Sequence, residues 1–135
     1  MRPVPRITMA AALAISWGSM LAHNLYELPL GPLDPENSGP LVVAVGLALV
    51  YAARPDSFLI ATIAFAWGVL NLVVGGLLSV LPLSVLPFVP ERSLSHYGAH
   101  VVYAMGQLPL VVVAYHAARS AATVGRRDPM DTARR

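Results

Sequence analysis

Polar side chains with the chemistry of metal or haem ligands gather near one end of two apolar segments of this chain. In the earlier segment, His23 and Glu27 are four residues apart and therefore lie on one face of a helix. In the later segment, spacings of 4, 3 and 4 residues place four polar side chains on one stripe: His96, His100, Tyr103 and Gln107. Polar residues inside apolar helices are costly and usually face a bundle interior, so they mark a candidate site.

Two kinds of ligand would suit these residues. In the first interpretation, His23 and His100 are the axial ligands of a b-type haem held between helices. In the second, zinc or copper is bound through imidazole and carboxylate groups, and the ligands are His23, His96, His100 and Glu27. In either case, outer-shell hydrogen bonds that fix the histidine tautomers come from four further residues: Asn24, Asn71, Tyr103 and Gln107.

A purely structural interpretation uses the same side chains. His23 and His100 would then each make one interhelical hydrogen bond, and His96 would lie in interfacial water. The His96–His100 pair lacks the glutamate of a His-Glu-x-x-His zinc motif, because Tyr97 and Gly98 follow His96. The sequence contains no phosphate-binding glycine loop, dinucleotide fingerprint or nucleophile elbow, and it predicts no catalytic residue.

The elements that position these residues are long apolar segments. The chain has 135 residues, of which 56% are hydrophobic and only 12% are charged, whereas soluble domains carry about 25% charged residues. This pattern predicts an all-α, polytopic integral membrane protein, a bundle of four transmembrane helices. A single domain is expected over 1–118, with helices covering about 7–28, 40–53, 57–81 and 95–118.

The distribution of arginine predicts the orientation. The chain has no lysine or cysteine, and with four crossings eight of its nine arginines fall on one side, leaving only Arg92 on the other. Arginine excess in short flanking segments marks the cytoplasmic side. We therefore expect a bacterial inner-membrane protein with both termini in the cytoplasm and the histidines His23, His96 and His100 toward the exterior.

The segment 119–135 is basic and is expected to form a flexible cytoplasmic tail. It carries five arginines against Asp128 and Asp131, which favours contact with anionic lipid. Nucleic-acid binding is not expected, because no aromatic residues are interleaved with the arginines. Besides the lipid bilayer, a second copy of the chain or a larger membrane complex is the expected partner.

Three hypotheses for function follow from these observations. The leading one is an accessory or binding subunit whose outward-facing histidine pocket holds haem or a transition metal. The second is a membrane redox or proton-handling component that uses His23, Glu27 and His100. The third is a structural membrane protein without a ligand. Soluble-type enzyme chemistry is not expected from any of them.

Overall fold

The computed structural model describes residues 3–81 and 93–125, and this part of the chain is helical with no strand. Four helices are present, as expected from the sequence. Their bounds are α1 Arg6–Glu27, α2 Pro35–Ala53, α3 Phe58–Leu70 and α4 Leu94–Gly125. Beyond α3 the same helix continues as the π-helix η1, Asn71–Leu77, and a short 3-10 turn, Leu78–Val80.

Three of the helices are long and apolar enough to cross a membrane. They are α2, the continuous helix Phe58–Val80 and α4. The α1 helix has 22 residues but falls outside this group, because Ser16, Ser19, His23 and Asn24 interrupt its apolar sequence. The all-helical prediction is confirmed for the described residues, whereas membrane insertion stays a prediction.

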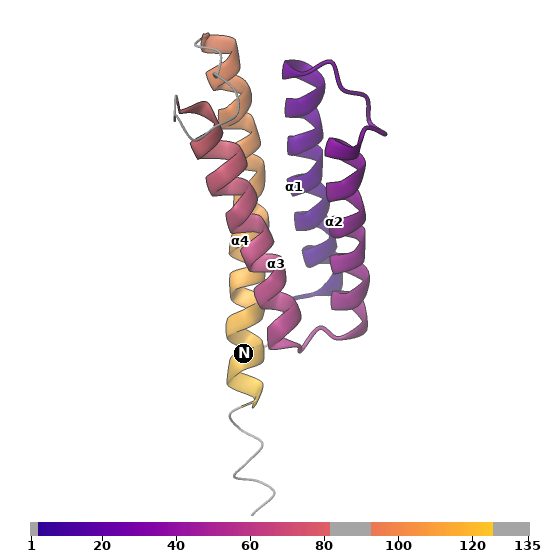
Figure 1. Ribbon diagram of the computed structural model, residues 1–135. Coiled ribbons are helices and arrows are strands. Elements are labelled where there is room, and N and C mark those ends of the chain that lie inside the picture. The colour runs from indigo at the N-terminus through magenta and orange to yellow at the C-terminus, as the bar shows by residue number, and fades with distance from the viewer. Residues whose placement is uncertain (1–2, 82–92, 126–135) are drawn as a thin grey trace, which may run out of the picture.

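Successive helices run in opposite directions and form an elongated bundle (Figure 1). Helix α4 packs against both α1 and α3, while α2 packs on α1 and touches α3 only slightly. This antiparallel order brings the end of α1, the end of η1 and the start of α4 to one end of the bundle. Residues far apart in the sequence are thereby assembled into one site.

Two helices extend beyond the expected ranges. Helix α2 begins at Pro35 rather than at 40. Proline is tolerated in the first turn of a helix, because an N–H group there would have no partner within the helix. Helix α4 continues to Gly125, so the first part of the expected tail from 119 is helical. The remaining tail, 126–135, lies outside the described residues, as do the segment 82–92 and its Arg92.

Small residues let the third helix approach α4 closely. A Cβ added at Gly76 would lie 3.0 Å from Cβ of Ala104, and one added at Gly75 would lie 2.6 Å from the Tyr103 hydroxyl. The π-helix η1 coincides with this contact, and π-helical turns frequently occur at functional sites. No sequence pattern predicted it.

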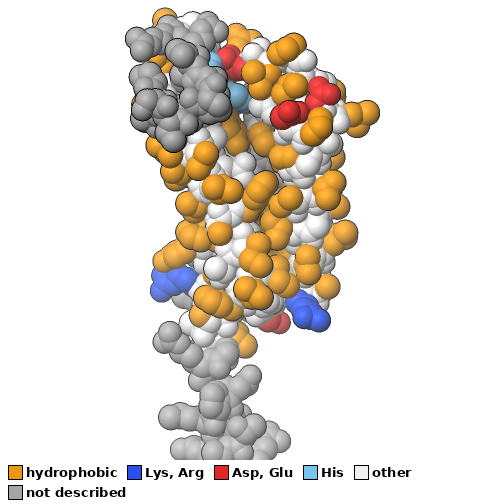
Figure 2. Space-filling model, in the orientation of Figure 1, with side chains coloured by type: hydrophobic (Ala, Val, Ile, Leu, Met, Phe, Trp, Pro, Cys, Tyr) orange, Lys and Arg blue, Asp and Glu red, His pale blue; other side chains and the backbone are white. Residues whose placement is uncertain are grey.

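The two ends of the bundle differ in chemistry (Figure 2). Among the described residues, the arginines Arg6, Arg54 and Arg119 lie where α1 and α3 begin and α2 and α4 end. The acidic residues Glu27, Asp34 and Glu36 lie at the other end, with the three histidines, whereas Asp56 lies at the end with the arginines. The part of the bundle nearer the arginines has an apolar core that includes Met9 and Leu110.

Candidate functional site

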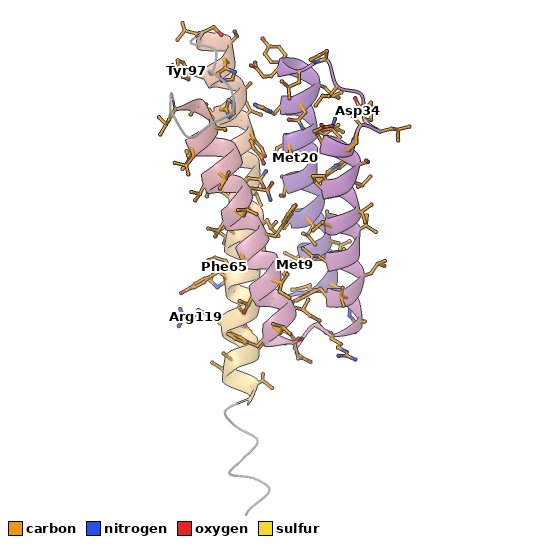
Figure 3. The ribbon with its side chains drawn as sticks, viewed as in Figure 1. Met9, Met20, Asp34, Phe65, Tyr97 and Arg119 are labelled. Carbon is orange, nitrogen blue, oxygen red and sulfur yellow. The ribbon has the colours of Figure 1, made fainter. Side chains whose placement is uncertain are left out.

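Three predicted histidines converge at the end of the bundle marked by Tyr97 and Asp34 in Figure 3. His23 comes from α1, and His96 and His100 come from α4. The Nε2 atoms of His23 and His100 are 3.1 Å apart, with ring centroids separated by 4.3 Å. The His96 ring lies 4.6 Å from that of His100. The helical spacing in the sequence therefore identified side chains that do meet.

A chain of hydrogen bonds fixes the tautomer of His23. The Gly31 carbonyl can only accept, so Asn37 must donate to it through Nδ2, at 2.8 Å. The Asn37 Oδ1 atom then accepts from Asn24 Nδ2, also at 2.8 Å. This leaves Asn24 Oδ1 facing His23 Nδ1 at 3.0 Å. His23 therefore carries its proton on Nδ1, and its Nε2 atom presents a lone pair.

His100 is held in the same tautomer by a backbone carbonyl. Its Nδ1 atom donates to the oxygen of Gly75 in η1, at 3.1 Å. The Ser79 hydroxyl donates to the same oxygen, so the carbonyl is the common acceptor for both groups. The Nε2 atom of His100 thus also presents a lone pair, and it lies 3.1 Å from the Nε2 atom of His23.

Two unprotonated nitrogens at 3.1 Å repel one another unless a cation lies between them. His100 is only 5% exposed, and His23 is partly buried. Burial of such a contact without compensation is costly, because low dielectric strengthens the repulsion. A proton or a metal ion close to both Nε2 atoms would remove this repulsion.

His96 is paired with a carboxylate. Its Nδ1 atom lies within hydrogen-bond distance of the Glu27 carboxylate, and both side chains are about nine-tenths buried. A carboxylate accepts the proton of Nδ1, so His96 also keeps Nε2 as its free nitrogen. That Nε2 atom is buried without a hydrogen-bond partner, which is uncommon in folded proteins.

Tyr103 and Asn71 form a buried support beneath the histidines. The Tyr103 hydroxyl donates to Asn71 Oδ1 at 2.9 Å, while Asn71 Nδ2 donates to the Trp67 carbonyl. The Tyr103 ring lies 5.5 Å from that of His23. Both residues were expected at the site, and the structure places them against it rather than between the imidazoles.

Gln107 belongs to a separate polar cluster deeper in the bundle. Its Nε2 atom donates to the Ser16 carbonyl and to the Ser19 hydroxyl, each at 3.0 Å. The Ser16 hydroxyl donates to its Oε1 atom. Gln107 is fully buried and its amide is fully bonded, so this cluster joins α1 to α4 and makes no contact with the histidines.

Asn37 is the site residue that sequence reasoning missed. Asn37 is completely buried and anchors the hydrogen-bond chain to His23. Its role depends on the turn between α1 and α2, which no spacing rule predicts. The one signal available in the sequence is an asparagine next to a turn rich in glycine and proline.

The fit of the expected cofactors differs. A haem iron between His23 and His100 would hold the two Nε2 atoms about 4 Å apart, with the macrocycle between them. At 3.1 Å the rings are in contact, so this arrangement does not favour haem. In the described residues, no group of three or more His, Asp or Glu side chains is placed to hold a metal ion.

A groove of about 470 Å³ runs along α1 and α4 beside His23. Its walls are mostly small or apolar: Ala22, His23, Tyr26, Ser95, Gly98, Ala99 and Val102. It gives the histidine pair an approach from the end and side of the bundle.

Comparison of the chain with protein-family models, with curated proteins and with solved structures finds no match.

Proposed function

We propose that the protein is a four-span integral membrane protein of the bacterial cytoplasmic membrane that binds a cation between His23 and His100 from the outer side. It acts as a binding or accessory subunit rather than as an enzyme of the soluble type. The observation that carries this proposal is the contact between the Nε2 atoms of His23 and His100. On each ring the other nitrogen, Nδ1, already donates a hydrogen bond.

The polar residues reach only partway along the bundle. Below the histidines lie Tyr103 and then the cluster around Gln107, and beyond that the α1–α4 contact is apolar, with Leu13 against Leu110 in the core. A path for ions across a membrane would need polar groups or water on both sides of this core. The arrangement therefore supports a site that is filled and emptied from one end.

The distance between the two Nε2 atoms also fits the proton-handling alternative. The Nε2–Nε2 distance of 3.1 Å is a normal hydrogen-bond length. An imidazole and an imidazolium that share one proton would satisfy it. Both alternatives place a cation at the same point, and they differ only in its identity.

The topology is tested by labelling single cysteines, because the natural chain contains none. Leu33 in the α1–α2 turn and Asp56 in the α2–α3 turn are both exposed and lie at opposite ends of α2. A membrane-impermeant maleimide should label Leu33→Cys in intact cells and Asp56→Cys only after permeabilisation. Labelling of both positions in intact cells, or the reverse pattern, would refute the proposed orientation.

Whether α1 crosses the membrane is tested with a third single-cysteine variant. Pro3 is exposed and precedes α1. We expect Pro3→Cys to behave like Asp56→Cys, since four crossings place both on the cytoplasmic side. Labelling of Pro3→Cys from the outside would show that α1 does not cross.

A further inference from the structure

We infer that the cation held between His23 and His100 is a proton taken up from the outer side, so that the strength of this contact follows the external pH. The inference rests on the proposed cation site and names its ligand. A proton needs only the two Nε2 atoms that already lie at hydrogen-bond distance. It leaves every other contact of the site in place, including the one between His96 and Glu27.

The first argument is the length of the contact. The Nε2 atoms of His23 and His100 are 3.1 Å apart, which is within the usual range for a hydrogen bond from an N–H group. Because each Nδ1 atom already donates its proton, a neutral pair has no hydrogen left for this bond. One added proton supplies it. A metal ion would need further ligands, and the described residues place no group of three or more His, Asp or Glu side chains to provide them.

The second argument is charge. The Glu27 carboxylate is about nine-tenths buried beside His96, and it acts electrostatically on His100. With His96 neutral, Glu27 brings one negative charge into the cluster, and one proton shared by His23 and His100 balances it. A divalent metal ion would instead leave one positive charge in excess. Buried charge is costly unless it is balanced, so a monovalent cation fits best.

Few other titratable groups surround the pair in the described part of the chain. On α1 and α4 they are Glu27, His96 and Tyr103. At this end of α2, Asp34 accepts from the Gly31 N–H and Glu36 is exposed, and neither bonds to the histidines. The remaining groups around the pair are uncharged: the Gly75 carbonyl, the Ser79 hydroxyl and the amides of Asn24, Asn37 and Asn71.

His23 is the ring through which the proton enters and leaves. It lines the groove of about 470 Å³ along α1 and α4 and is partly exposed, whereas His100 is only 5% exposed. A charged group is favoured where water can solvate it, so His23 becomes the imidazolium and His100 is the neutral acceptor. A hydronium ion in the groove gives its proton to Nε2 of His23 and leaves as water, and the reverse step returns the proton to the same side.

The number of protons on the pair sets the strength of the α1–α4 contact at this end of the bundle. One proton joins the rings by a charge-assisted hydrogen bond. Without it two lone pairs lie 3.1 Å apart, and with two protons two cations share the same short contact, so both of these states are repulsive. The contact is therefore strongest at an intermediate pH. The bonds of Gln107 keep α1 and α4 joined deeper in the bundle.

The test is a double-mutant cycle of His23→Ala and His100→Ala. The unfolding midpoint of the purified full chain in detergent is measured between about pH 4 and 9, the range that brackets histidine titration. We expect a coupling of at least about 3 °C at the optimum, which disappears towards both ends of the range. In a Glu27→Gln background the alkaline limit of the coupling should move to lower pH, because the balancing negative charge is gone.

His116 provides the matched control, because it is an exposed histidine at the opposite end of α4. His116→Ala should keep the profile of the natural chain, and EDTA should leave the coupling unchanged. Zinc serves as a probe of the spacing of the pair: it competes with the proton for both lone pairs, so it should bind more weakly as the pH falls.

If a variant loses its helical circular dichroism, ¹H–¹⁵N NMR of the natural chain replaces the cycle. One low-field proton signal correlated with two histidine nitrogens should then appear only at intermediate pH. Its absence throughout the range would overturn the inference.

The other contradicting results separate the inference from the proposed function. A stoichiometric metal ion in the natural chain as purified, with the coupling lost after EDTA, would overturn the inference and leave the cation site in place. A coupling that does not change with pH, or none in folded variants, would overturn the cation site as well. Neither result alters the labelling of Leu33→Cys and Asp56→Cys, which tests the membrane orientation separately.

Discussion

The closest approach between α1 and α4 provides a quantitative test of the packing that holds the site together. A Cβ added at Gly106 would lie 2.2 Å from both Cβ and Oγ of Ser19. Ordinary contacts between such atoms are about 3.5–4.0 Å. In Gly106→Ala the two helices must therefore separate by more than about 1 Å, or the Ser19 turn must shift.

The cost of this change can be worked out from its parts. Overpacking of a tight contact costs about 1–3 kcal/mol, and loss of the hydrogen bond from Gln107 to the Ser19 hydroxyl adds about 1 kcal/mol. The better helix propensity of alanine than of glycine offsets up to about 1 kcal/mol of this cost. We expect the free energy of unfolding of Gly106→Ala to fall by about 1–3 kcal/mol, measured by denaturant titration in mixed micelles and circular dichroism.

The His23–His100 contact should respond as well, since His23 lies one helical turn beyond Ser19. Separation of α1 from α4 increases the distance between His23 and His100, so the affinity of the proposed cation site, measured with zinc, should fall together with stability. Gly18→Ala is the matched control, because an added Cβ there meets nothing within 4 Å. It should be neutral or slightly stabilising.

Rescue makes the test specific. Ser19→Gly removes both atoms that the new methyl group would meet, so the double variant should recover stability relative to the sum of the single changes. We expect a favourable coupling energy of at least about 1 kcal/mol in this double-mutant cycle. Stability of Gly106→Ala equal to that of Gly18→Ala, or strict additivity in the cycle, would refute the reasoning.

Two further predictions concern buried amides. Gln107→Leu removes the amide that joins α1 to α4 and should lower the free energy of unfolding by about 1–3 kcal/mol in the same titration, and a change within 0.5 kcal/mol of zero would contradict this role. Asn37→Asp places an oxygen against the Gly31 carbonyl and breaks the chain that orients His23. Zinc affinity should then fall by about 10–100-fold, whereas an unchanged affinity would mean that this chain does not fix the tautomer.

Helical periodicity was enough to predict the fold and part of the site. The apolar runs gave the four helices, and their alternation placed the end of α1 beside the start of α4. Because spacings of three and four residues define a helix face, His96 and His100 could be assigned to one stripe that faces His23. The structure brings these three rings together.

Features that depend on local backbone geometry could not be predicted in the same way. The change from α- to π-helix at Asn71 coincides with the close approach of Gly75 to Tyr103, and no pattern of residue types predicted it. The role of Asn37 depends on the turn that precedes α2. Glu27 was expected as a metal ligand because it carries a carboxylate, and the structure pairs this carboxylate with Nδ1 of His96.

The state of the two facing nitrogens decides the central claim. Solid-state or solution ¹⁵N NMR of the full chain with labelled histidine distinguishes Nδ1–H from Nε2–H. Spectra of His23→Ala and His100→Ala assign the signals to each ring. We predict Nδ1–H in both His23 and His100, with both Nε2 atoms bound to a shared proton or to a metal ion. A neutral pair in which one ring carries its only proton on Nε2 and donates it to the other would contradict the account, because an ordinary hydrogen bond would then explain the contact without any cation.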